Sequence, residues 1–101
     1  MGKKYESFYI LKEDCDKKAI IEKINQMVKE QGGNIYHTEE IGLKKLAYEV
    51  KGYKEGYYYL ADFEVAESSK NTAIRLSKKI NTIEEVLKHI VLKLDEEEGY
   101  K

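Results

Sequence analysis

Hydrophobic positions recur along the chain with two periods, one typical of strands and one typical of helices. In residues 46–50, and again in residues 57–65, apolar side chains fall at every second position, which predicts two half-buried strands. A short turn over residues 52–56 joins them as an antiparallel hairpin. Gly42 predicts a bulge or bend in the first of these strands, which begins at about residue 35. We take this hairpin as the candidate working part of the molecule.

Two helices are predicted from apolar residues that recur at three- and four-residue spacing. Asp14 or Asp16 can cap the first helix, and Ser68 or Ser69 can cap the second. A Gly-Gly pair ends the first helix. The inward-facing stripes consist of Ile20, Ile21, Ile24, Met27, Val28 and Gln31 in the first helix, and of Ala73, Leu76, Ser77 and Ile80 in the second.

The order of elements is βαββαβ, because residues 5–11 and 86–94 read as a first and a fourth strand. This order predicts an α+β, ferredoxin-like fold, in which both helices cover one face of a four-stranded antiparallel sheet and the first and third strands are central. The other face is then bare, and we infer that it is a surface for a partner. Its predicted apolar residues are Phe8, Ile10, Tyr58 and Leu60.

Length and composition fit one soluble domain with a heavily charged surface. The chain has 101 residues, of which 42% are hydrophobic and 37% charged, with a net charge of -1. We expect a folded domain over residues 1–94 and an acidic, disordered tail over residues 95–101. No segment reaches the ~20 apolar residues of a membrane span, and no secretion signal is recognisable. A cytoplasmic location is therefore predicted, and the single cysteine, Cys15, fits a reducing compartment.

Catalytic chemistry finds little support in the sequence. The same fold carries acylphosphatases, which hold a phosphate between the first strand and first helix beside an arginine. Here residues 12–16 contain three carboxylates, which would repel an anion, and the only arginine is Arg75 in the second helix. His37 and His89 have no partner at ligand spacing, and the acids beside Cys15 oppose thiolate formation. We expect no enzyme activity, no metal or cofactor and no small-molecule substrate.

A binding module for single-stranded RNA, of the RRM type, is the alternative. Residues 56–60, Gly-Tyr-Tyr-Tyr-Leu, echo the aromatic third-strand motif whose rings stack on bases. The echo is incomplete, because Tyr58 stands where the motif has a small residue and Asp62 where it has an aromatic one. For Tyr57 and Tyr59, ordinary strand and core positions are the simpler interpretation.

Lysines supply the positive charge that a nucleic-acid backbone requires. The strand order leads us to expect a cluster at one end of the sheet, formed by Lys3, Lys4, Lys51, Lys54 and Lys93. Lysines of the first helix alternate with acids and read as a solvated face.

The segment Gly-Leu-Lys-Lys-Leu-Ala-Tyr-Glu-Val at residues 42–50 resembles the signature of the bacterial small-subunit ribosomal protein six family, and the resemblance extends over nearly the whole chain. It implies a structural part of the small ribosomal subunit, a ribonucleoprotein of translation. It also implies binding to the central domain of the small-subunit rRNA and pairing with ribosomal protein eighteen. Lys44 and Lys45 are then positions for rRNA or partner contact. Glu49 replaces a frequent proline of the family, and the basic positions carry lysine instead of arginine, which loses the forked donor geometry.

Two sets of residues follow from these interpretations. The residues expected to contact RNA are Lys3, Lys4, Lys44, Lys45, Lys51, Lys54 and Lys93. The residues expected to contact the protein partner are Phe8, Ile10, Leu46, Tyr48, Tyr58 and Leu60. By the resemblance, Leu46 and Tyr48 also anchor their strand.

Overall fold

The computed structural model describes residues 2–66, 68 and 71–94. The elements follow the order β1 (Gly2–Lys12), α1 (Lys17–Glu30), β2 (Asn34–Val50), β3 (Tyr53–Ala66), α2 (Thr72–Ile80) and β4 (Val86–Leu94), which confirms the predicted βαββαβ succession. The predicted acidic tail, residues 95–101, lies outside the described residues. The division into a domain over residues 1–94 and a tail therefore stays a prediction.

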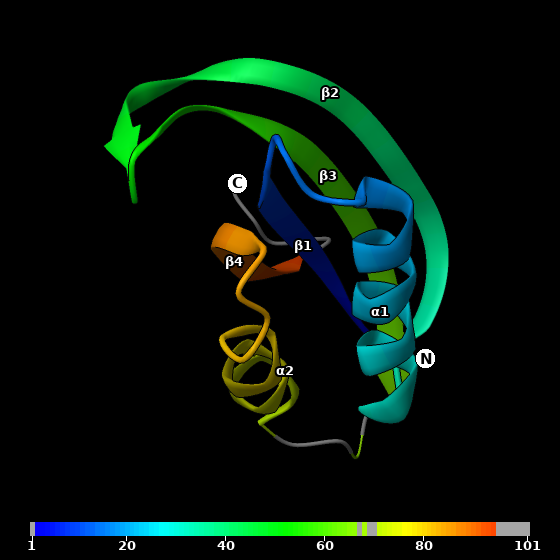
Figure 1. Ribbon diagram of the computed structural model, residues 1–101. Coiled ribbons are helices and arrows are strands. Elements are labelled where there is room, and N and C mark those ends of the chain that lie inside the picture. Colours follow the sequence, from blue (N-terminus) through cyan, green and yellow to red (C-terminus); the bar gives the residue numbers. More distant parts are fainter. Residues whose placement is uncertain (1, 67, 69–70, 95–101) are drawn as a thin grey trace.

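The four strands form one antiparallel sheet in the order β2-β3-β1-β4, so the ferredoxin-like fold with β1 and β3 at the centre is confirmed. The register of the central pair runs from Gly2 opposite Ala66 to Lys12 opposite Gly56. Both helices lie on the same side of the sheet, and the long hairpin of β2 and β3 arches over the domain (Figure 1). The start of β1 thus meets the end of β3, not its start.

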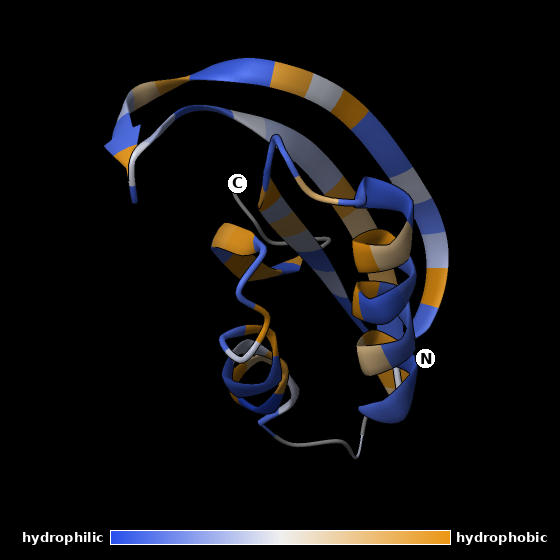
Figure 2. Ribbon diagram, viewed as in Figure 1, coloured by the Kyte–Doolittle hydropathy of each residue, from blue (hydrophilic) through white to orange (hydrophobic). Residues whose placement is uncertain are grey.

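The core lies between the helices and the odd-numbered side chains of β1 and β3. Tyr5 stacks on Phe63 with ring centroids 5.5 Å apart, and Tyr9 stacks on Tyr59 at 6.0 Å. The side chains that α1 and α2 add to this core are Ile20, Ile21, Ile24, Val28, Leu76 and Ile80. Figure 2 shows the hydrophobic residues of α1 gathered on one side of the helix, as the predicted stripe requires.

The helix ends agree with the sequence in α1 and differ in α2. Asp16 caps α1, because its carboxylate accepts a hydrogen bond from the backbone N–H of Ala19 at 3.3 Å. Gly32, with φ of 88°, follows the last turn in the left-handed conformation that ends many helices. The N-cap of α2 is Asn71, itself left-handed with φ of 60°, so the predicted cap at Ser68 is wrong. The alternative cap, Ser69, lies outside the described residues.

Two core tyrosines differ in how their hydroxyl groups are satisfied. The Tyr59 hydroxyl donates a hydrogen bond to Asn25 Oδ1 at 2.8 Å. The Tyr9 hydroxyl is buried and has no hydrogen-bond partner among the described residues. The nearby Ser7 hydroxyl donates to the carbonyl oxygen of Ala61 at 2.8 Å. Burial raises the pKa of both phenols, so both stay protonated near neutral pH.

The two tyrosines therefore predict opposite effects of the same substitution. Tyr59→Phe removes a hydrogen bond and should lower the free energy of unfolding by about 1 kcal/mol. Tyr9→Phe removes a buried group that has no partner and should leave stability unchanged or raise it by up to about 1 kcal/mol. Urea unfolding of the two variants measures this, and a clear loss of stability in Tyr9→Phe would contradict the assignment.

Candidate nucleic-acid interface

The distal part of the β2–β3 hairpin, residues 43–55, extends past the end of β1, and we call it the arm (Figure 1). Only its first residues, Leu43 and Lys44, lie opposite residues of β3 that still pair with β1. It begins after Gly42, which has a φ of 106° and stands at a shift of register between β2 and β3. The predicted bulge at Gly42 is confirmed. A bulge increases the local twist of a strand, so it changes the direction of the arm relative to the rest of the sheet.

The turn of the arm consists of Lys51 and Gly52, which lie between the paired residues Val50 and Tyr53. Both turn residues have positive φ, 51° and 86°, which is the geometry that matches the twist of a two-residue hairpin. The predicted turn over residues 52–56 is wrong, because β3 already begins at Tyr53.

Pairing between the two strands of the arm is interrupted. Lys45 pairs with Glu55 and Val50 pairs with Tyr53, so residues 46–49 of β2 face a single residue of β3. These four residues have no ladder partner among the described residues. Backbone hydrogen bonds therefore do little to fix the orientation of the outer part of the arm relative to the sheet.

The inner part of the arm folds toward the face of the sheet that the helices leave bare. Gly56, inside β3, has no room for a side chain, because a Cβ there would collide with Ile10 and would lie 3.5 Å from the Leu46 side chain. Leu46 thus packs over the end of β1. An open recess of about 140 Å³ lies between arm and sheet and is lined by Ile10, Leu46, Ala47, Tyr48, Val50, Tyr58 and Lys88.

Tyr48 joins the arm to β4 on this bare face. Lys88 Nζ donates a hydrogen bond to the Tyr48 hydroxyl at 3.0 Å, and the same ammonium group lies 5.2 Å from the centre of the ring. The hydrogen bond first, and then the positive charge of Lys88, lower the pKa of Tyr48. Tyr48 is 64% exposed, so it connects the arm to β4 on the surface and is not a core residue.

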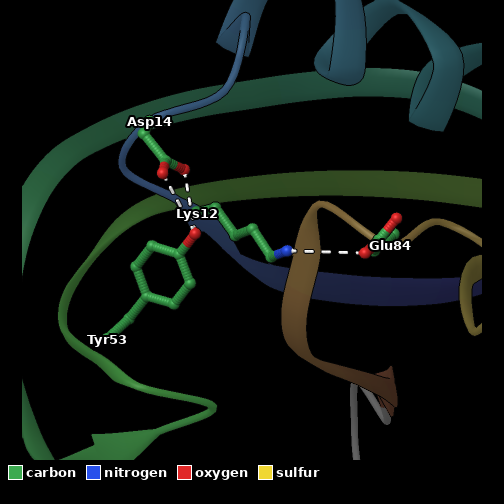
Figure 3. Close-up of polar contacts among 4 residues, drawn as sticks. All are labelled: Lys12, Asp14, Tyr53 and Glu84. Carbon is green, nitrogen blue, oxygen red and sulfur yellow. Dashed lines mark hydrogen bonds and ion pairs between the residues drawn. The ribbon is translucent and has the colours of Figure 1, made fainter.

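Tyr53 joins the arm to the loop between β1 and α1, on the opposite side (Figure 3). Its hydroxyl donates to both carboxylate oxygens of Asp14, each at 3.1 Å. Lys12 Nζ lies 5.6 Å from the ring centre and 3.9 Å from Glu84 Oε2, so the contact continues to the loop before β4. Partial burial, and then the hydrogen bond to Asp14, raise the pKa of Tyr53.

The arm carries four exposed lysines, and none of them forms an ion pair with any described residue. Two precede the turn by several residues, one is in the turn, and one follows it by two residues. They are Lys44, Lys45, Lys51 and Lys54. Their ammonium groups are hence available to an external anion.

The predicted cluster of lysines from both hairpin and termini is wrong. Because β1 and β3 are antiparallel, the start of β1 lies at the far end of the sheet from the arm. Lys3, Lys4 and Lys93 gather there, since Tyr5 is opposite Lys93 and Lys4 is opposite Leu94. The predicted RNA-contact residues therefore form two groups at opposite ends of the sheet. Whether each binds RNA stays a prediction.

The bare face bears the apolar residues predicted for it. Phe8 and Tyr58 make an edge-to-face contact at 5.5 Å, and Leu60 lies opposite Phe8 in the next strand. β4 enlarges this surface with Ile90 and Leu92, which are 53% and 55% exposed. Sequence reasoning assigned the alternation of β4 but missed that its exposed half continues the same face.

The RRM-like alternative is weakened, because two of the three tyrosines in its motif do not face the bare side of the sheet. Tyr57 and Tyr59 point to the helix side of the sheet, where their hydroxyls donate to Glu40 at 2.6 Å and to Asn25 at 2.8 Å. Tyr58 alone faces the bare side, with its ring against the edge of Phe8 and the arm beside it. Stacking several bases needs more than one free ring.

The loop over residues 12–16 does not assemble a phosphate site. Cys15 is half-buried and its thiol donates to the Lys12 carbonyl oxygen at 3.1 Å, while burial raises its pKa. Arg75 donates to Gln31, at the other end of α1 from this loop. The thiol therefore stays protonated, and the guanidinium lies too far along the helix to share an anion with it.

Among the described residues no three histidine, cysteine, aspartate or glutamate side chains converge as ligands, and neither helix is long or apolar enough to cross a bilayer. His37 is exposed, whereas His89 is half-buried on the helix side, where burial lowers its pKa.

Comparisons with known proteins agree with this architecture. Residues 4–93 match the sequence model of a family described as "Ribosomal protein S6". The small ribosomal subunit protein bS6 of Moorella thermoacetica is 30% identical over 92% of this chain and 95% of its own length. That of Carboxydothermus hydrogenoformans is 32% identical over 94% and 99%. The crystal structure of 30S ribosomal protein S6 from Thermotoga maritima superposes with a TM-score of 0.82, at 21% identity, over 93% of this chain and 89% of that one.

The packing of the arm onto β1 predicts a penalty at Gly56. Gly56→Ala places a methyl group against Ile10 and should lower the free energy of unfolding by about 1–3 kcal/mol. The same substitution in an Ile10→Ala background should cost less, because the colliding methyl group is gone. Urea unfolding of the four chains measures the coupling, and equal costs in both backgrounds would contradict the contact.

Proposed function

Because this chain belongs to the ribosomal protein S6 family, we propose that it binds small-subunit rRNA through its arm and pairs with ribosomal protein eighteen through the bare face of its sheet. Family membership makes it a structural, non-enzymatic component of the small ribosomal subunit. The prediction that the chain is not an enzyme agrees with this membership. The central domain of the rRNA as the binding region, and the cytoplasm as the location, belong to the proposal.

One observation carries the rRNA contact: four lysines that form no ion pair with any described residue lie on an arm that leaves the body of the domain. Residues 43–55 contain these four lysines and only Glu49 and Glu55 as acids, so the arm has a net charge of +2. Lysine ammonium groups bind phosphates as point charges without selecting a base. The arrangement therefore suits a backbone contact whose strength depends on salt.

The protein partner is proposed for the bare face beyond the arm. Phe8, Leu60, Ile90 and Leu92 lie there on three neighbouring strands, and no described helix covers them. An apolar area of this kind, surrounded by charged residues, is typical of a protein–protein interface. Leu46, Tyr48 and the recess beside them border the same surface, so a partner that docks there would also touch the arm.

The lysines at the other end of the sheet are proposed as a second, separate rRNA contact. About nine residues of β1 separate Lys3 from Lys12, which at ~3.3 Å per residue is roughly 30 Å. Lys3, Lys4 and Lys93 therefore cannot share phosphates with the arm. They would meet another segment of the folded rRNA.

Reversing the charge of the arm tests its contact with rRNA. Lys44→Glu together with Lys45→Glu should weaken binding to small-subunit rRNA in the presence of ribosomal protein eighteen. The slope of log affinity against log salt should fall by about 2, because roughly two phosphate contacts are lost. Filter binding over a series of salt concentrations measures both quantities.

Lys18→Glu together with Lys23→Glu is the matched control, since it makes the same change of charge on exposed residues of α1. This control should change the slope far less. If the two double variants had equal effects, the arm would contribute to rRNA binding only through the net charge of the protein, and the proposed specific contact would be wrong.

Substitution of Lys51 tests rRNA binding separately from stability, because the same change should weaken binding while it keeps or raises the stability of the fold. Asparagine tolerates the left-handed conformation of this turn position better than lysine does, so Lys51→Asn should keep or raise the free energy of unfolding, by up to about 0.5 kcal/mol. The lost ammonium group should still weaken rRNA binding and lower the salt slope by about 1. Unfolding in urea and filter binding give the two readings, and unchanged affinity would remove Lys51 from the interface.

A further inference from the structure

We propose that Tyr48 and Tyr53 are positioning residues for rRNA binding: their hydroxyls tie the arm to two sides of the domain and hold its lysines in one place. This inference rests on the proposed function of the arm. Neither tyrosine needs to touch RNA for it to hold. Their role is to define where the four ammonium groups stand before RNA arrives.

The arm requires such ties because its own backbone pairing is broken. Residues 46–49 bulge out of the ladder, between the pair Lys45 and Glu55 and the pair Val50 and Tyr53. A two-stranded ribbon that no third strand supports is marginally stable in water. The direction of the arm therefore depends on side chains that reach the rest of the domain.

The two tyrosines lie on either side of the turn and reach in opposite directions. Tyr48 is in the bulge and accepts a hydrogen bond from Lys88 of β4, on the bare face, at 3.0 Å. Tyr53 is the first residue after the turn and donates to Asp14, before α1, at 3.1 Å. Contacts from both sides oppose rotation of the arm either way, which one contact alone would not do.

The residues that the two tyrosines contact, Lys88 and Asp14, lie on or next to strands that are held by backbone pairing. Lys88 pairs with Ile10 in the register of β1 and β4. Asp14 lies two residues after Lys12, whose ammonium group lies over the Tyr53 ring and whose backbone N–H donates to the Glu85 carbonyl oxygen at 2.9 Å. The arm is thus connected to the central strand and to β4. A preorganised set of charges binds a structured anion more tightly than a mobile set, because less freedom is lost on binding.

Tyr57 provides a matched control within the same strand. Its hydroxyl also donates to a carboxylate, Glu40 Oε1, at 2.6 Å. This bond joins β3 to β2 inside the hairpin, so it connects the arm to nothing outside. Tyr57→Phe removes a comparable hydrogen bond without releasing the arm.

The test combines a distance measurement with rRNA binding. Spin labels at Glu49→Cys in the arm and Lys23→Cys in α1, in a Cys15→Ser background, report the spread of arm positions by double electron–electron resonance. Tyr48→Phe together with Tyr53→Phe should broaden the distance distribution, whereas Tyr57→Phe should leave it narrow. Without labels, the same pair of changes should weaken binding to small-subunit rRNA with ribosomal protein eighteen about 2- to 20-fold, as expected for the loss of two exposed polar contacts.

A conservative change separates the tie from a general loss of structure. Asp14→Asn keeps an oxygen that accepts the Tyr53 hydrogen bond, so its distance distribution should stay narrow, while Asp14→Ala should broaden it. An unchanged distribution in the double tyrosine variant overturns the proposal. A broadened distribution with unchanged affinity also overturns it and leaves rRNA binding by the arm intact. If the unaltered protein binds no rRNA, the proposed function is wrong, and the distance measurement still decides whether the tyrosines hold the arm.

Discussion

The antiparallel ladder between β1 and β3 is the constraint on which the rest of this structure depends. Its eleven pairs run without a shift from Gly2 opposite Ala66 to Lys12 opposite Gly56. Because side chains alternate along both strands, one unbroken register assigns every second residue to the helix side and the others to the bare face. The ladder also ends where β1 ends, and β2 and β3 continue without it. The arm therefore exists because β1, with 11 residues, is shorter than β2 and β3, which have 17 and 14.

Much of the fold could be predicted because local patterns in the sequence determine the type of each helix and strand. Alternation in residues 57–65 and the helical stripe around Ile24 give the type of each element, and the order of elements leaves few topologies. Gly42 indicated its bulge because a glycine inside a strand has few other reasons to be there. The turn was predicted to extend to Gly56 because glycine is common in turns, and this prediction was wrong. The absent side chain of Gly56 serves close packing against Ile10, a tertiary contact that sequence spacing does not encode.

The candidate site was harder to predict because it depends on register and on distant side chains. The lysines that could bind RNA were identified by type, but their grouping was wrong, since only the register shows which strand ends coincide. The contact of Tyr48 with Lys88 spans 40 positions, and that of Tyr53 with Asp14 spans 39. Tyrosine, lysine and aspartate are ordinary surface residues, so nothing in the sequence distinguishes these four from the others.

If both cationic groups, at Lys4 and at Lys45, bind rRNA as proposed, their separation makes the domain bivalent. Once one end has bound a folded rRNA, the second end meets its own segment as an intramolecular partner, at an effective concentration set by the distance between the two RNA segments. Under this proposal a rigid sheet would fix the distance between the two cationic groups, so the protein would favour RNA folds whose two binding segments are the same distance apart. Short RNA fragments that reach only one end would therefore understate the affinity for the intact rRNA.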